Sequence, residues 1–226
     1  MFTGIVTDVG EITSLTPTAQ GQEVVLELWG KKYAFSLPLY GSFQVSNILA
    51  ALGLLAGCEG DTAKAISTIP TLQGVPGRLE KIAVHPSGAA IFVDYAHTPA
   101  ALANILHTLR PHTQNRLLVV FGCGGDRDKG KRPQMGRIAA QLADIVVVTD
   151  DNPRSEDAAV IRAEVVAASP GAHNIGDRRK AIHFAVQQLR AGDVLVIAGK
   201  GHEKTQIIGS EVLPFDDAMV AKEAAA

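Results

Sequence analysis

The sequence predicts an α/β fold in which a mostly parallel β-sheet carries helices on both faces and follows a smaller α+β segment. Short runs of valine, isoleucine and leucine, such as 117–121 and 145–148, alternate with helical segments that have one apolar face. Strands that are apolar throughout are typical of parallel sheets buried under helices. Polar clusters follow these strands directly, at the position where open α/β sheets bind ligands. These observations predict a Rossmann-like sheet with a binding site at its carboxyl edge.

The smaller segment precedes the sheet. Residues 1 to about 40 alternate between apolar stretches and polar or glycine-containing turns, which is typical of antiparallel strands or hairpins. Apolar residues then recur at helical spacing over 45–52, and a second short helix is expected over 61–67. Prolines and glycines gather at 70–77. We therefore expect two domains, residues 1–73 and residues 74–226.

The larger segment repeats a strand, a loop and a helix. The expected strands are 89–93, 116–121, 144–149 and 193–198. The expected helices begin at Thr98, Pro133 and Asp177, with a further helix that ends near Ala168. A hairpin over 206–213 and a terminal helix capped near Asp216 complete the segment.

Composition excludes several classes of protein. Hydrophobic residues make up 46% and charged residues 19% of the 226 residues, which is ordinary for a globular protein. A formal charge of -2 gives no reason to expect nucleic acid or a membrane surface as a partner. Cys58 and Cys123 are far apart and lack metal-ligand spacing, so we expect no disulfide, no zinc site and a reducing cytoplasm. The apolar runs are too short to span a membrane.

The first polar cluster is Asp94-Tyr95-Ala96-His97-Thr98-Pro99, just after strand 89–93. A carboxylate and an imidazole at a strand end can bind a ribose or lie beside an adenine. The alternative is structural: Asp94 and Thr98 would serve as turn and cap residues, and His97 would be solvated. The residues alone favour neither interpretation.

The second cluster is a glycine-rich loop over 122–132. From Gly125 to Lys131 it matches the phosphate-loop spacing G-x-x-x-x-G-K, but Arg132 follows where a serine or threonine would hold magnesium. Pro133 also removes a backbone donor. We therefore reject a true phosphate loop and expect a loop that contacts an anion. Its available basic side chains are Arg127, Lys129 and Lys131.

The third and fourth clusters offer opposite charges. Asp150-Asp151-Asn152-Pro153-Arg154 follows the third strand, and its arginine fork is the usual partner of a carboxylate. Gly199-Lys200-Gly201-His202-Glu203 follows the last strand, where the glycines permit close approach by a ligand and Glu203 can receive an ammonium group. The alternatives are a helix-opening turn with solvated charges and a tight turn with exposed charges.

In this order and spacing, the segments resemble the Mur ligase family from about residue 36 onward. Leu39 to Ala51 resembles the end of the family's central ATPase domain, and Pro76-Gly77-Arg78 resembles the junction into its C-terminal domain. The resemblance implies that 1–73 is a remnant of the central ATPase domain and that 74–226 is the amino-acid-binding domain.

The resemblance also implies an ATP-dependent carbon–nitrogen ligase of peptidoglycan synthesis. Asp151-Asn152-Pro153-Arg154 is similar to the family's motif for meso-diaminopimelate, whose second carboxylate lysine lacks. The implied residues around that amino acid are Arg127, Asp151, Asn152, Pro153, Arg154, Gly199 and Glu203. The implied residues around ATP are Asn47, Arg78, Asp94, His97, Lys129 and Lys131. The implied partners are meso-diaminopimelate, ATP with Mg²⁺, UDP-N-acetylmuramoyl dipeptide and the N-terminal part of the ligase; no catalytic residue or metal ligand is assigned.

The sequence also departs from the family. It contains no glycine-rich G-K-T loop, no N-terminal domain for the UDP sugar and no central-domain lysine whose carbamate helps to hold magnesium. We therefore expect this chain alone to be an incomplete ligase. The alternative is a non-catalytic module that binds an amino acid or a nucleotide or docks on a partner. Met1 to Ile12 resembles the opening of riboflavin synthase, but twelve residues cannot form that barrel, which indicates coincidence or a fusion scar.

Overall fold

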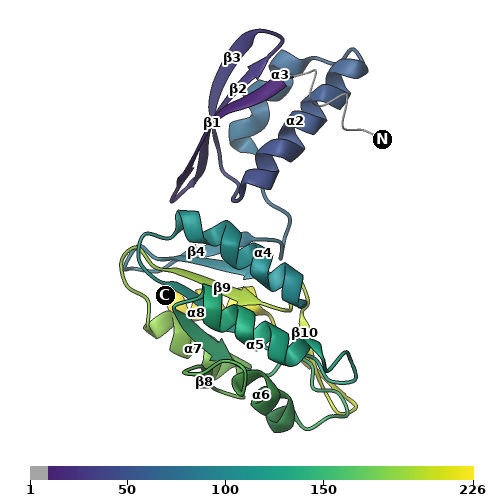
Figure 1. Ribbon diagram of the computed structural model, residues 1–226, viewed down its shortest axis with the longest axis vertical. Coiled ribbons are helices and arrows are strands. Elements are labelled where there is room, and N and C mark those ends of the chain that lie inside the picture. The colour runs from purple at the N-terminus through teal and green to yellow at the C-terminus, as the bar shows by residue number, and fades with distance from the viewer. Residues whose placement is uncertain (1–9) are drawn as a thin grey trace. The chain divides into compact units, whose positions relative to one another are not determined.

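The structure is a computed structural model that describes residues 10–226. The chain forms two compact units that divide after Gly74. Figure 1 colours the first unit purple to blue and the second unit teal to yellow. The division lies in the stretch of prolines and glycines where the sequence changes its pattern.

The first unit is a three-stranded antiparallel sheet followed by two helices. The sheet has the order β1–β2–β3, formed by β1 (Gly10–Thr18), β2 (Gly21–Leu28) and β3 (Lys31–Leu37). The helices are α2 (Ser42–Gly57) and α3 (Thr62–Thr68), followed by the 3₁₀ turn η1 (Ile69–Thr71). Alternate residues of β2 and one face of α2 form the core of this unit: Val24, Leu26, Leu28, Val45, Leu49 and Leu52.

The expected antiparallel strands and both expected helices of this unit are present. The α2 face follows the predicted spacing, because its buried residues recur every three or four positions. Of the stretch that resembles riboflavin synthase, residues 10–12 open β1 and residues 1–9 lie outside the described part of the chain.

The second unit is built on a six-stranded sheet with the order β4–β5–β9–β6–β7–β8. Its strands are β4 (Glu80–Val84), β5 (Ala90–Asp94), β6 (Leu117–Phe121), β7 (Ile145–Val148), β8 (His173–Asn174) and β9 (Val194–Ala198). β4 is an antiparallel edge strand, and the other five run parallel. The predicted α/β fold with a mostly parallel sheet is confirmed.

Helices cover both faces of this sheet (Figure 1). α4 (Pro99–Leu109), α5 (Lys131–Leu142) and α6 (Ala158–Val166) pack in a row, with the 3₁₀ turn η2 (Arg110–His112) after α4. α7 (Arg178–Gln187) and α8 (Asp217–Ala225) pack together against the buried core residues that face them from the strands, such as Leu118, Val120, Leu195 and Ile197. The hairpin of β10 (Thr205–Ile208) and β11 (Glu211–Pro214) stands outside the sheet. No helix among residues 10–226 combines the length and the apolar character that a membrane crossing needs.

The connections bring four strand ends together. The chain runs from β5 through α4 to β6, then through α5 to β7 and through α6 to β8. It returns through α7 to β9, which inserts between β5 and β6. Since β5, β9, β6 and β7 are parallel neighbours, the loops after them meet at one edge of the sheet.

Short polar side chains fix where the helices begin. Thr98 Oγ1 accepts a hydrogen bond from Ala101 N, and Pro99 occupies the first turn of α4. Asp157, Asp177 and Asp216 cap α6, α7 and α8 in the same way. The Asp157 cap explains why α6 begins at Ala158, several residues after Arg154.

Sequence analysis did not predict β4 and β8. β4 is an edge strand whose residues are all at least partly exposed, so it lacks the continuous apolar run of the central strands. β8 has only two residues, both exposed. Neither strand presents an apolar pattern long enough to detect.

Candidate functional site

Lys200 lies at the centre of the carboxyl edge, just after β9. Its side chain is fully buried. Its Nζ donates to Asn152 Oδ1 and to Thr205 O, both at 2.8 Å, and lies 3.2 Å from Asp151 Oδ1. Burial lowers the pKa of Lys200, and the Asp151 carboxylate opposes that shift. The alternative of a tight turn with exposed charges is therefore wrong for Lys200.

Asn152, in the loop after β7, connects that loop to the loop after β9 and to the β10–β11 hairpin. Its Oδ1 accepts hydrogen bonds from Lys200 Nζ and from Ile207 N, the latter at 3.0 Å. Its Nδ2 lies 3.5 Å from Glu203 Oε2, the outer limit of a hydrogen bond. The amide oxygen thus points into the protein and the amide nitrogen points towards Glu203.

Arg154 lies on the other side of Asn152. Its Nη1 donates to Gly125 O at 2.8 Å and approaches Asn152 O at 3.4 Å. Its backbone has φ 52°, in the left-handed region that an arginine seldom adopts. Two backbone hydrogen bonds to the β10–β11 hairpin, Arg154 N to Ile207 O and Gly209 N to Arg154 O, hold it there. Arg154 and Glu203 therefore flank Asn152 at the same edge of the sheet.

The glycine-rich loop after β6 packs tightly against the loop after β7. A Cβ added at Gly125 would lie 1.9 Å from Pro153 O, and one at Gly122 would lie 2.4 Å from Thr149 O. At these positions glycine permits the contact of two backbones, in addition to any approach by a ligand. The absence of a side chain thus has a structural reason that the sequence alone did not reveal.

Side chains from the Ser155–Glu156 turn hold the tip of that loop. Asp126, at φ 52°, accepts from Ser155 Oγ at 2.6 Å and from Ser155 N at 3.2 Å. Glu156 Oε1 accepts from Asp126 N at 2.7 Å and pairs with the buried Arg132 at 2.9 Å. Arg132 in turn reaches Glu164 on α6 at 3.0 Å. These contacts fix the loop from which Arg127 and Lys129 project.

The acid stability of the second unit is expected to depend on Glu156. The hydrogen bond from Arg132, followed by that from Asp126 N, lowers the pKa of Glu156 to about 2. A depressed carboxyl pKa adds stability above the unfolded-state value, and that stability is lost as pH falls from about 4.5 towards about 2. Glu156→Gln should therefore unfold less steeply with acid over this window than the wild type in circular dichroism titrations. Parallel curves would contradict the assignment.

The basic side chains of the loop are differently placed. Lys129 Nζ lies 3.2 Å from Glu156 Oε2 and is 66% exposed. Lys131, the first residue of α5, donates to His97 O at 2.9 Å. Arg127 Nη1 donates to the carbonyl oxygen of its neighbour Asp126 at 3.0 Å. Lys131 is thus tied to the first cluster, whereas Lys129 stays largely in solvent.

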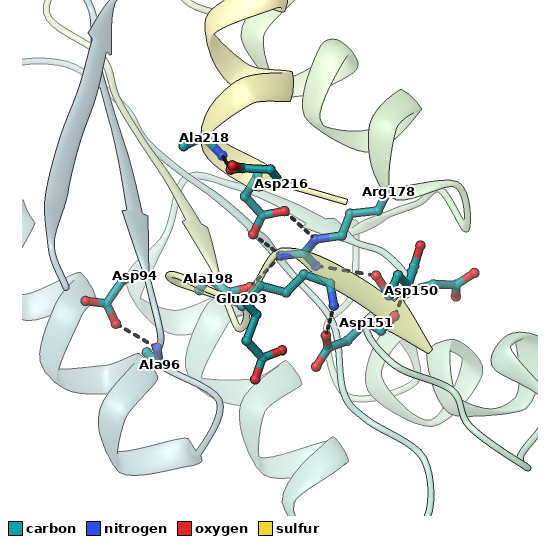
Figure 2. Close-up of polar contacts among 12 residues, drawn as sticks. Asp94, Ala96, Asp150, Asp151, Arg178, Ala198, Glu203, Asp216 and Ala218 are labelled. Atoms are coloured by element: carbon teal, nitrogen blue, oxygen red, sulfur yellow. Dashed lines mark hydrogen bonds and ion pairs between the residues drawn. The ribbon is translucent and has the colours of Figure 1, made fainter. Parts of the chain in front are cut away.

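The first cluster begins with a buried carboxylate at the end of β5. Asp94 Oδ2 accepts from Leu79 N at 2.7 Å and Oδ1 accepts from Ala96 N at 2.6 Å, the bond drawn in Figure 2. Burial raises the pKa of Asp94, and the two backbone hydrogen bonds oppose that shift. Asp94 therefore shapes the turn.

An aromatic stack covers this cluster. The Arg78 guanidinium lies over the Tyr95 ring at 4.5 Å, and Tyr95 stacks on His202 with ring centroids 5.6 Å apart. His97 Nδ1 is 2.9 Å from Tyr95 O, so the turn holds this imidazole, which is partly exposed. A Cβ added at Gly77 would lie 2.2 Å from His202 N, which brings the start of the unit against the loop after β9.

An ion pair that sequence analysis missed lies beneath the site. Arg178 and Asp217 have no exposed side-chain surface and form two hydrogen bonds, Nε to Oδ1 at 2.8 Å and Nη2 to Oδ2 at 2.7 Å. The guanidinium also reaches Ala198 O at 3.1 Å and Asp150 O at 3.4 Å (Figure 2). It joins α7 and α8 to the ends of β9 and β7. Sequence analysis assigned no role to Arg178, which directly follows the expected helix cap Asp177.

The implied site residues fall into separate groups. The loops after β7 and β9 bring together Asp151, Asn152, Pro153, Arg154, Gly199 and Glu203. Arg78, Asp94, His97 and Lys131 gather near the end of β5. Arg127 and Lys129 lie on the loop after β6, and Asn47 lies on α2 of the first unit. Within residues 10–226, no group of three or more His, Cys, Asp or Glu side chains could hold a metal ion.

Comparison with known proteins gives consistent matches. Residues 77–201 match the family described as "Mur ligase, glutamate ligase domain". The chain is 54% identical to the UDP-N-acetylmuramoyl-L-alanyl-D-glutamate–2,6-diaminopimelate ligase of Caulobacter vibrioides, over 91% of this chain and 42% of that protein. A solved structure of a ligase with that name has a TM-score of 0.78 at 41% identity, over 96% of this chain and 45% of the other.

A more distant solved structure is folylpolyglutamate synthase of Mycobacterium tuberculosis, complexed with ADP and AMPPCP. It has a TM-score of 0.62 at 25% identity, over 83% of this chain and 44% of that one. The chain thus spans less than half of the length of each of these three relatives.

Proposed function

This chain belongs to the Mur ligase family, and from that premise we propose that it is the amino-acid-accepting part of an ATP-dependent ligase. The proposed reaction adds meso-diaminopimelate to UDP-N-acetylmuramoyl-L-alanyl-D-glutamate in peptidoglycan synthesis. The name of the Caulobacter relative supports this substrate, as does the chemistry of the loops after β7 and β9.

One observation supports the proposal most strongly: a guanidinium and a carboxylate lie on either side of one residue, Asn152, the first near its backbone carbonyl and the second near its side-chain amide. Arg154 Nη1 lies 3.4 Å from Asn152 O, and Glu203 Oε2 lies 3.5 Å from Asn152 Nδ2. The second amino-acid end of diaminopimelate carries a carboxylate and an ammonium group. We propose that Arg154 binds the former and Glu203 the latter, with Arg127, Asp151, Pro153 and Gly199 around them.

This arrangement determines what the residues do for the reaction. Holding the second amino-acid end at two charged points positions the amine at the other end of the substrate for attack on an activated carboxyl group. The attacking amine must be neutral, so it has to lie away from Glu203, whose carboxylate would favour the ammonium form. The side chains after β7 and β9 therefore orient the nucleophile without reacting themselves.

The nucleotide part of the proposal concerns the cluster after β5. Arg78, Asp94 and His97 are proposed to face ATP, with Lys129 or Lys131 near phosphate and Asn47 near adenine. The ADP and AMPPCP bound to the related synthase support a nucleotide in this family. Mg²⁺ is expected with ATP, but residues 10–226 offer no cluster of His, Cys, Asp or Glu side chains that fits the ion.

Isothermal titration calorimetry with this chain tests the proposal. We expect binding of meso-diaminopimelate at least about tenfold tighter than binding of L-lysine, because a charge-assisted pair contributes about 1.5–3 kcal/mol and lysine lacks the carboxylate that forms it. Equal affinities for the two amino acids would refute the proposed substrate. A response to neither would leave the docking alternative as the better description.

A further inference from the structure

The orientation of the Asn152 amide is fixed by its neighbours. A lysine ammonium carries only donors, and so does a backbone N–H. Both donate to Asn152 Oδ1, Lys200 Nζ at 2.8 Å and Ile207 N at 3.0 Å. The two lone pairs of that oxygen are therefore in use, and a flipped amide would set its own N–H groups against two donors.

This orientation decides what Asn152 can offer a ligand. With Oδ1 occupied, only Nδ2 faces the open side of the edge, near Glu203 Oε2 at 3.5 Å. That contact is long, so the amide retains donor capacity. A donor at this point favours a carboxylate oxygen and offers no acceptor for an ammonium group.

Burial of Lys200 is difficult to explain by stability alone. Removing an ammonium group from water costs several kcal/mol, which a counter-charge offsets only with good geometry. Here Asp151 Oδ1 lies 3.2 Å from Nζ, and no other donor reaches this buried oxygen among residues 10–226. A methionine would fill a similar volume without that penalty.

We propose that Lys200 is a positioning residue: its ammonium group locks the Asn152 amide with the donor side outward, so that the site selects an amino acid with a second carboxylate. This inference rests on the proposed function, since it assumes that the site binds meso-diaminopimelate. It assigns the discrimination against lysine to a residue that does not touch the substrate. Asn152 contacts the carboxylate, and Lys200 acts through Asn152.

The first test uses the ligand-free wild-type chain and nuclear Overhauser contacts of the Asn152 side-chain amide. We expect contacts from the Nδ2 protons to Glu203 and none to the Lys200 methylene next to Nζ. Contacts to Lys200 in place of Glu203 would show the opposite orientation and overturn the inference. This measurement needs neither a variant nor a substrate.

The second test compares Lys200→Met with Arg116→Met. Arg116 also pairs with a buried carboxylate, Asp193 at 2.5 Å, but at the amino end of the strands, far from Asn152 in the topology. Calorimetry should give an affinity of Lys200→Met for meso-diaminopimelate about tenfold weaker than wild type, with lysine binding little changed. Arg116→Met should keep the wild-type ratio of the two affinities.

The outcomes separate the inference from the function beneath it. If the wild-type chain does not prefer meso-diaminopimelate, the proposed function is refuted, and so is the selectivity inferred from it. The Overhauser contacts then still test whether Lys200 fixes the orientation of the Asn152 amide. A wild type that prefers meso-diaminopimelate, with the same preference in folded Lys200→Met, refutes only the role of Lys200. If Lys200→Met does not fold, Lys200→Arg, which keeps a donor, should retain the preference, and its loss would count against the inference.

Discussion

Replacing Arg178 by methionine is expected to lower the free energy of unfolding of the second unit by about 3–5 kcal/mol. The substitution leaves the Asp217 carboxylate buried without its partner, because both side chains of this pair have no exposed surface. It also removes donors to Ala198 O and Asp150 O at the ends of β9 and β7. Urea denaturation followed by far-ultraviolet circular dichroism measures the loss.

The neighbouring residue provides a matched control. Arg179 also reaches α8, where it pairs with Glu223 at 2.5 Å, but both side chains are about half exposed, at 53% and 51%. Arg179→Met should therefore cost no more than about 1 kcal/mol. The only tryptophan, Trp29, lies in the first unit, so its fluorescence should report the same transition in both variants. Equal losses for Arg178→Met and Arg179→Met would contradict the buried pair.

Replacing Arg154 by methionine is expected to weaken binding of meso-diaminopimelate by about 2–5 kcal/mol, or roughly 30-fold or more. The second carboxylate of meso-diaminopimelate would lose its proposed partner, the Arg154 guanidinium, while Asn152 and Glu203 remain in the site. Binding of L-lysine should change little, because lysine has no carboxylate for Arg154. Calorimetry on the same preparations measures both affinities.

A comparison with lysine and a control variant distinguish the loss of one ion pair from a general disruption of the loops. Arg154 also donates to Gly125 O, so a general collapse of the loops would weaken both amino acids equally. Arg190→Met, at an exposed position after α7, should bind both amino acids like the wild type. A parallel loss of lysine and diaminopimelate binding in Arg154→Met would contradict a specific role for the guanidinium.

The sequence predicted the central sheet because its strands are continuous apolar runs. β5, β6, β7 and β9 are buried almost throughout, so nearly all of their residues are apolar and the strand pattern is easy to recognise in the sequence. The same runs end in glycines and charged residues, so the edge of the sheet could be located as well. β4 and β8 were not predicted, because β4 is a partly exposed edge strand and β8 has only two residues.

The partners of the charged residues could not be predicted. Arg178 and Asp217 are 39 positions apart, and Lys200 and Asn152 are 48 apart, so only the return of the chain through α7 to β9 brings each pair together. Sequence patterns suggest which side chains lie at strand ends, but not which point inward. Lys200 illustrates the difference, because a tight turn with exposed charges remained an alternative for the motif that contains it, whereas its side chain is fully buried.

A crystal structure of this chain with meso-diaminopimelate bound would locate the second amino-acid end of the ligand directly. We expect one carboxylate of the ligand on Arg154 and Asn152 Nδ2, the adjacent ammonium on Glu203, and the other amine free at the mouth of the site. A ligand bound elsewhere, or one whose second amino-acid end touches neither Arg154 nor Glu203, would contradict the proposal.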